Sequence, residues 1–106
     1  MKPINFAVIL ATDVDNLENN PKYDNDWDLY YADFENAVIC HFAVPDSSHY
    51  EELVNPLWTP GGYWQASIGK FKDIVSTLFD ETVKQACESI LPQLAKYDDA
   101  TEIVLV

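Results

Sequence analysis

The chain has 106 residues, of which 48% are hydrophobic and 13% aromatic, enough apolar surface to form a core without disulfides or metals. Its eighteen acidic residues are opposed by six lysines and no arginine, so the formal net charge is −12. This balance excludes direct nucleic-acid binding as a first expectation, because proteins that bind phosphates carry an excess of basic residues. The length leaves no room for a second unit, and we expect a single domain over residues 1–106.

The sequence gives no sign of a membrane segment, a secretion signal or a redox motif. The apolar run at residues 6–11 is too short to span a bilayer and lacks the basic start and cleavage site of a signal peptide. We therefore expect a cytoplasmic protein with no membrane partner. Cys40 and Cys87 stand far apart in apolar surroundings, which predicts two buried free thiols.

The first half of the chain predicts three strands. Residues 4–12 (INFAVILAT) are apolar on both faces of the pleat, as in a central strand that is covered on two sides. Residues 13–26 are acidic and rich in Asn, with Pro21 as a breaker, and predict a loop. Strands are expected at 27–34 and 37–44, joined by a hairpin turn at Glu35 and Asn36.

The second half predicts helices and a last strand. Apolar residues recur at helical spacing from 50 to 57, and Ser48 and Glu51 have the spacing of a capping box, so a short helix should end near Pro56. Residues 55–64 (NPLWTPGGYW) predict an aromatic loop between helices. From 63 to 94 a period of 3.6 predicts one long helix or two, with Asp80 as a cap and Pro92 as a kink or end. Residues 101–106 predict a strand inside the sheet.

The expected order is therefore β-β-β-α-α-β, an α+β fold with a roughly four-stranded sheet and helices packed on one face. The end of the chain, a helix followed by residues 98–106 (DDATEIVLV), resembles the tail of the barstar family of acidic ribonuclease inhibitors. That family also finishes with a helix and an apolar strand. The resemblance covers only this end, the first half of the chain departs from it, and no functional residue carries over.

The acidic segment, residues 13–35, holds eight carboxylates and one lysine, and so −7 of the net −12. In an extended chain Asp24, Asp26 and Asp28 would share one face at a spacing of roughly 6.8 Å, twice the rise of about 3.4 Å between phosphates of a DNA strand. Such a row would imitate a nucleic-acid backbone toward a basic partner; the alternative is a solvated loop that maintains solubility. The expected partner-binding carboxylates are Asp13, Asp15, Glu18, Asp24, Asp26, Asp28, Asp33 and Glu35.

The same residues suggest a calcium loop, but the pattern fails where the geometry is strictest. Five residues between Asp24 and Glu35 fall at positions 1, 3, 5, 7 and 12 of an EF-hand loop. Leu29 stands where the sharp turn requires glycine, and the residues that follow have strand character. We expect no metal site and no cofactor.

Catalytic patterns are weak. Asp46, Ser47, Ser48 and His49 are adjacent in sequence and are better explained as helix caps, and His41 lies in a predicted strand. No glycine-rich phosphate loop is present, and without arginine the usual bidentate clamp for anionic substrates is missing. We expect no catalytic residues; a small metal-assisted hydrolase that uses Asp13, Asp15 or His41 is the alternative from another class.

Aromatic residues accompany the acids. Trp58 and Trp64 flank Pro60 and are either a plug that closes the core or an exposed anchor for a partner. Tyr30 is one of several aromatics within the acidic segment. Because a surface of acids and aromatics is typical of protein binding, Tyr30, Trp58 and Trp64 join the expected partner-binding residues.

These features favour a non-enzymatic inhibitor that occludes a basic partner, most simply an immunity protein that neutralises a bacterial nuclease toxin. The alternative is a phage-encoded nucleic-acid mimic that blocks a host defence complex, of the anti-CRISPR or anti-restriction type. Both hypotheses rest on electrostatic complementarity and differ only in the partner.

Overall fold

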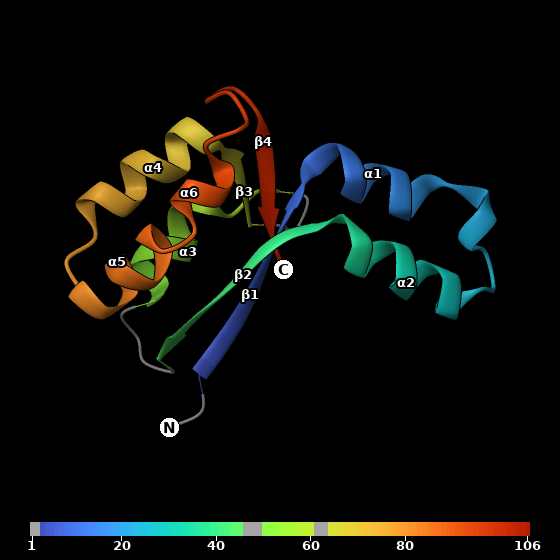
Figure 1. Ribbon diagram of the computed structural model, residues 1–106, viewed down its shortest axis with the longest axis horizontal. Helices are drawn as coiled ribbons and strands as arrows, with labels where there is room; N and C mark the ends of the chain where they lie inside the picture. Colours follow the sequence, from blue (N-terminus) through green and yellow to red (C-terminus); the bar gives the residue numbers. More distant parts are fainter. Residues whose placement is uncertain (1–2, 46–49, 61–63) are drawn as a thin grey trace.

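The computed structural model describes residues 3–45, 50–60 and 64–106. Its centre is a four-stranded antiparallel sheet in the order β2-β1-β4-β3, as Figure 1 shows. The strands are β1 (Pro3–Leu10), β2 (Val38–Pro45), β3 (Trp64–Ser67) and β4 (Glu102–Leu105). Val8 of β1 lies opposite Cys40 on one side and Leu105 on the other, so β1 and β4 are the inner strands.

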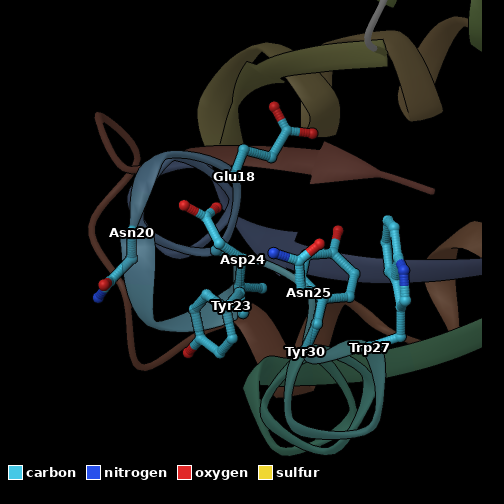
Figure 2. A pocket seen from close by; sticks show the side chains of 8 residues that line it. Glu18, Asn20, Tyr23, Asp24, Asn25, Trp27 and Tyr30 are labelled. Atoms are coloured by element: carbon cyan, nitrogen blue, oxygen red, sulfur yellow. The ribbon is translucent and has the colours of Figure 1, made fainter.

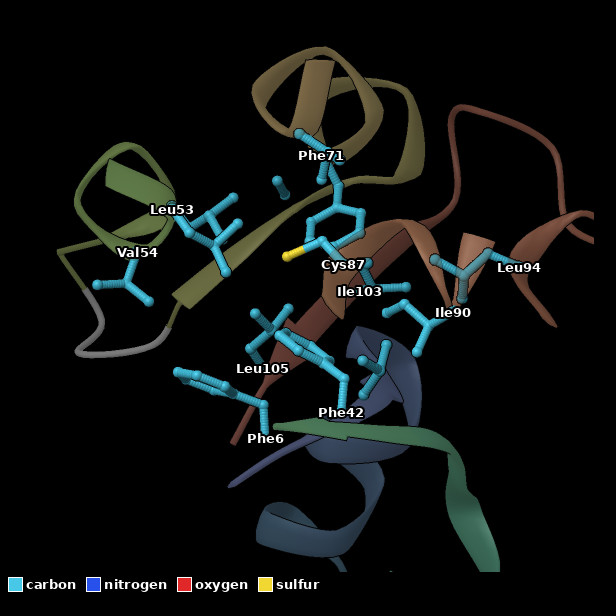
Figure 3. Packing of buried hydrophobic residues seen from close by; sticks show 14 of the residues in the cluster. Phe6, Phe42, Leu53, Val54, Phe71, Cys87, Ile90, Leu94, Ile103 and Leu105 are labelled. Carbon is cyan, nitrogen blue, oxygen red and sulfur yellow. The ribbon is translucent and has the colours of Figure 1, made fainter. Parts of the chain in front are cut away.

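One face of the sheet is covered by helices from the second half of the chain (Figure 1). These are α3 (Glu51–Val54), the 3-10 turn η3 (Asn55–Leu57), α4 (Ile68–Thr77), α5 (Glu81–Glu88) and α6 (Leu91–Leu94). In Figure 3, Phe6 and Phe42 extend from the sheet toward Phe71 and Cys87 of these helices. Each fully buried side chain of this size stabilises the fold by about 1.5–3 kcal/mol, so this layer is the main core.

The other face is covered only at one end. Ile9 and Val104 alternate to this face and pack with Val14 and Leu17 of α1 (Ala11–Asn19) and with Tyr23 of the turn η1 (Pro21–Tyr23). The chain then continues into α2 (Trp27–Ala37), which leads to β2. Residues 11–37, which we call the acidic hairpin, project past the end of the sheet in Figure 1, and none of the eleven residues of α2 is buried.

Local signals explain how the acidic hairpin reverses direction. The side chain of Asn20 accepts a 3.1 Å hydrogen bond from the backbone N–H of Lys22 and caps η1. Asp26 caps α2 by accepting a 3.1 Å bond from the N–H of Leu29. Asn25 between them has a φ of 64°, a left-handed conformation that Asn tolerates better than most residues.

The structure corrects the predictions for residues 13–36. The expected loop at 13–26 contains most of α1, the expected strand at 27–34 is the greater part of α2, and the expected turn at Glu35 and Asn36 lies within that helix. The spacing of Trp27, Tyr30 and Phe34 is helical, and their rings contact one another along α2. A helix satisfies the backbone internally and gathers these rings, whereas a strand would divide them between two faces.

The predictions for the remaining elements are closer. The strand expected at 37–44 is β2, and the final strand is β4, which pairs between β1 and β3. The long helix divides at Asp80, whose carboxylate accepts a 3.0 Å bond from the N–H of Val83 and caps α5. Pro92 lies in the first turn of α6 and does not end a helix. Residues 64–67, expected to begin the long helix, form the short strand β3.

The α+β class and the four-stranded sheet are therefore confirmed, while the order becomes β-α-α-β-α-β-α-α-α-β. The short helix predicted before Pro56 is α3, followed by η3; Ser48 of its capping box lies outside the described residues. Cys40 and Cys87 are buried free thiols, as predicted. Within the described part of the chain, no helix has the length and apolar character needed to cross a membrane.

Candidate partner-binding site

The acidic hairpin carries all eight of the carboxylates expected to bind a partner. Asp13, Asp15 and Glu18 lie on α1, Asp24 and Asp26 connect η1 to α2, and Asp28, Asp33 and Glu35 lie on α2. All are exposed except Asp13 and Asp33, which are half-buried. The clustering seen in sequence is thus also a clustering in space, on a part of the molecule that projects from the sheet (Figure 1).

Asp26 and Asp33 make contacts that hold the acidic hairpin together. Asp26 caps α2, and Asp33 accepts a 2.6 Å hydrogen bond from the hydroxyl of Tyr23 and lies 3.7 Å from the ammonium of Lys22. The bond to Asp33 is the main cause that raises the pKa of Tyr23. These contacts fasten η1 to α2, so Asp26 and Asp33 shape the acidic hairpin itself.

The extended row of carboxylates is not formed. Asp24 follows η1, Asp26 is the N-cap of α2 and Asp28 lies in the first helical turn. The chain therefore turns at these residues, and the hypothesis that they imitate the regular phosphate spacing along one strand is wrong. The negative charge is spread over two helices and their connection.

A cluster of rings lies along α2. Tyr30 is central, with its ring centroid 5.9 Å from Tyr23, 6.0 Å from Trp27, 5.5 Å from Tyr31 and 6.4 Å from Phe34. Trp27 and Tyr31 remain 68% and 60% exposed. Of the aromatic residues in this segment, only the half-buried Tyr30 was among the expected partner-binding residues. The helical spacing of residues 27, 30, 31 and 34 was the signal that could have added the two exposed rings.

The second aromatic group is separate from the acidic hairpin. Trp64 is part of β3 and packs at 5.7 Å against Phe6, within the core on the other face of the sheet. Trp58 is paired to Trp64 by a single bridge and is 61% exposed. Trp64 therefore closes part of the core and Trp58 is exposed, and neither residue lies in the hydrophobic cluster of the acidic hairpin.

Two grooves separate the helices of the acidic hairpin. The larger has a volume of about 420 Å³, and the side chains that line it are shown in Figure 2. The smaller, of about 330 Å³, contains Lys22 beside Asp33. The larger groove is lined by Leu17, Glu18, Asn20, Tyr23, Asp24, Asn25, Trp27 and Tyr30, described residues of which none is basic.

In the part of the chain that the structure describes, the residues of the alternative sites are not brought together. Residues 27–37 are helical and cannot wrap around a calcium ion as the second half of an EF-hand loop does. Among residues 3–45, 50–60 and 64–106, no three His, Cys, Asp or Glu side chains are placed to hold a metal. His41 is exposed on β2 opposite Ala7, and residues 46–49 lie outside the described part.

Comparison of the chain with protein-family models, with curated proteins and with solved structures finds no match.

Proposed function

We propose that this protein is a non-enzymatic inhibitor that places its acidic hairpin against the basic nucleic-acid groove of a partner, as an immunity protein against a bacterial nuclease toxin in the cytoplasm. The observation that carries the proposal is the acidic hairpin: eight carboxylates and one lysine on two projecting helices and their connection, with Trp27 and Tyr31 exposed beside them.

The negative charge of this surface favours rapid association with a basic partner and selectivity for it. A nuclease binds phosphates with lysines and arginines, and a carboxylate-rich surface is complementary to that groove. Electrostatic steering raises association rates by roughly 10 to 1,000-fold and weakens as salt screens the charges. Because the charge is concentrated on a projecting element, it is presented without interference from the rest of the molecule.

The aromatic residues supply the binding energy that surface charges lack. Exposed ion pairs contribute only about 0–1 kcal/mol each, whereas buried aromatic anchors dominate most interfaces. Trp27 and Tyr31 lie within the acidic surface, and in the free protein these two large rings are exposed to water. When a partner buries them, these two rings surrounded by carboxylates would form the kind of aromatic hot spot that such interfaces contain.

The test begins with capture of partners from source-cell lysate and identification by mass, followed by measurement of the association rate. Between about 0.1 M and 1 M salt the Debye length falls from about 10 to about 3 Å, and the rate should fall with it. Replacing Asp15→Asn, Asp28→Asn and Glu35→Gln together should lower the rate at the lower salt concentration by about 10-fold or more. All three side chains are exposed.

The matched control removes the same charge from the helical layer on the other face of the sheet, with Asp73→Asn on α4 and Glu81→Gln and Glu88→Gln on α5. This variant should associate at nearly the original rate. Equal rates at both salt concentrations, or equal losses in the two triple variants, would overturn the proposal. Capture of a host defence complex in place of a toxin would overturn the immunity-protein assignment and favour the phage-encoded nucleic-acid mimic.

A further inference from the structure

The larger groove of the acidic hairpin places aromatic rings next to carboxylates. Figure 2 shows Trp27 and Tyr30 extending from α2, Glu18 on α1 and Asp24 in the connection between η1 and α2. The ring centroids of Trp27 and Tyr30 are 6.0 Å apart and the ring planes meet at 75°, an edge-to-face contact in which Trp27 remains 68% exposed. The groove therefore offers both a π surface and acceptors for hydrogen bonds.

The smaller groove shows that a ring and a carboxylate together bind a cation. The ammonium of Lys22 lies 4.9 Å from the centre of the Tyr23 ring and 3.7 Å from the carboxylate of Asp33. In this groove the cation is a side chain of the protein's own chain. The larger groove has the same two kinds of group, but its described lining residues include no cation.

We propose that the larger groove receives an arginine side chain of the basic partner. The inference rests on the proposed function and names the group that its binding surface recognises. A guanidinium is planar and stacks on tryptophan and tyrosine faces, while its fork of N–H donors pairs with carboxylates. A volume of about 420 Å³ lies near the lower end of the range of roughly 300–1,000 Å³ for small-molecule pockets, a size that suits a single side chain.

Arginine fits this groove better than lysine. An ammonium is a compact, strongly hydrated charge that neither stacks nor binds a carboxylate through two parallel bonds. With Trp27 as the stacking face, Asp24 is the exposed carboxylate that pairs with the guanidinium in the same groove. The smaller groove, which holds Lys22, also contains two carboxylates, Asp13 and Asp33, but its lining has one aromatic ring, Tyr23, and no tryptophan.

The probe for the test is N-acetyl-arginine amide, with N-acetyl-lysine amide beside it, titrated into the intact protein while the indole N–H signal of Trp27 is followed by NMR. The arginine probe should shift this signal saturably and bind about two- to fivefold more tightly than the lysine probe. Trp27→Leu, which keeps an apolar side chain but removes the ring, and Asp24→Asn should each weaken binding by a similar factor.

Two control variants separate the groove from general acidity. Asp28→Asn removes one charge from the same acidic hairpin but lies outside the groove lining, and Trp58→Ala removes an exposed tryptophan elsewhere. Both should bind the arginine probe as the original protein does. The proposal is overturned by the lack of a saturable shift, by equal affinity for the two probes, or by an Asp28→Asn loss as large as that of Asp24→Asn.

The partner assay distinguishes this inference from the proposed function. If Trp27→Leu and Asp24→Asn leave partner association unchanged while the triple acidic hairpin variant loses it, the arginine site is wrong and the inhibitor proposal stands. The opposite result is that the groove binds the arginine probe while the rate of partner association changes neither with salt nor in the triple variant. In that case the arginine site is supported and the inhibitor proposal is wrong. Circular dichroism of each variant confirms that α2 remains helical.

Discussion

Tyr23 connects the parts of the acidic hairpin through three different interactions. Its ring is 9% exposed and packs in the cluster that contains Leu17 and Val104, its edge meets Tyr30, and its hydroxyl donates to Asp33. It also lines both grooves, as Leu17 does, so these two side chains form the wall between the grooves. This position explains why Asp33 shapes the site while the carboxylates around it face solvent.

The two cysteines give a prediction at the residue scale. Burial is the main cause that raises the pKa of Cys87 to about 12, with the negative charge of Glu88 adding to it, and burial also raises the pKa of Cys40. Since the thiolate is the reactive form, Ellman's reagent should not label either thiol in the folded protein near pH 8, and should label both in denaturant. Labelling of Cys87 at the rate of a free thiol would contradict the structure.

The same shift predicts how stability depends on pH. A thiol in the unfolded chain has a pKa of about 8.5, and the folded state holds the proton to a higher pH. The stabilisation by the protonated thiols is therefore complete below about pH 8.5 and is lost as the pH rises toward 12. In Cys87→Ala the free energy of unfolding, measured by urea denaturation, should be lower than in the original protein below pH 8.5 and should fall less steeply above it.

At the scale of elements, the acidic hairpin marks the limit of sequence-based prediction. The strands that became β1, β2 and β4 have β-branched runs that identify them without tertiary information. The α1 sequence is rich in Asp and Asn, which have low helix propensity, and it forms a helix because Val14 and Leu17 pack against Ile9 and Val104. Those partners come from both ends of the chain, so no local pattern could reveal them.

The candidate site, too, was predictable only in part. The eight carboxylates were found because residues that cluster within a short segment stay close in space whatever secondary structure the segment forms. The exposure of Trp27 and Tyr31 depends on which side of α2 faces α1, and that orientation follows from tertiary packing. For Trp64 the sequence left a core plug and an exposed anchor open, because its partner Phe6 lies far away in sequence; the structure packs Trp64 against the core.

Two helix caps test whether the acidic hairpin is an independent unit. Asp80 caps α5, whose Val83 and Cys87 are buried in the core, so Asp80→Ala should lower the free energy of unfolding by about 1 kcal/mol. Asp26 caps α2, which buries no residue, so Asp26→Ala should accelerate amide exchange within α2 with a smaller effect on global stability. Urea denaturation and hydrogen exchange measure the two effects. Equal global losses would show that α2 unfolds together with the sheet.

At the scale of the whole molecule, the charge is distributed asymmetrically. The segment 13–35 holds −7 of the net −12, and it lies in the hairpin that projects from the sheet, away from the helices that cover the main core (Figure 1). Like charges at helical spacing, such as Asp15 and Glu18, destabilise a helix by about 0.2–0.5 kcal/mol for each pair. The acidic hairpin therefore carries an electrostatic cost in the free protein that a basic partner would remove.

This cost predicts that salt stabilises the free protein. Screening between about 0.01 M and 1 M salt shortens the Debye length from about 30 to about 3 Å, and the free energy of unfolding should rise by on the order of 1 kcal/mol. The triple variant of Asp15, Asp28 and Glu35 should be more stable at low salt and gain less from screening, whereas the control triple should gain as much as the original protein. An equal gain in both triples would show that the repulsion is a property of the net charge alone. A larger gain for the control identifies the acidic hairpin as its source, and then the repulsion that weakens the free protein and the attraction that binds a basic partner arise from the same carboxylates.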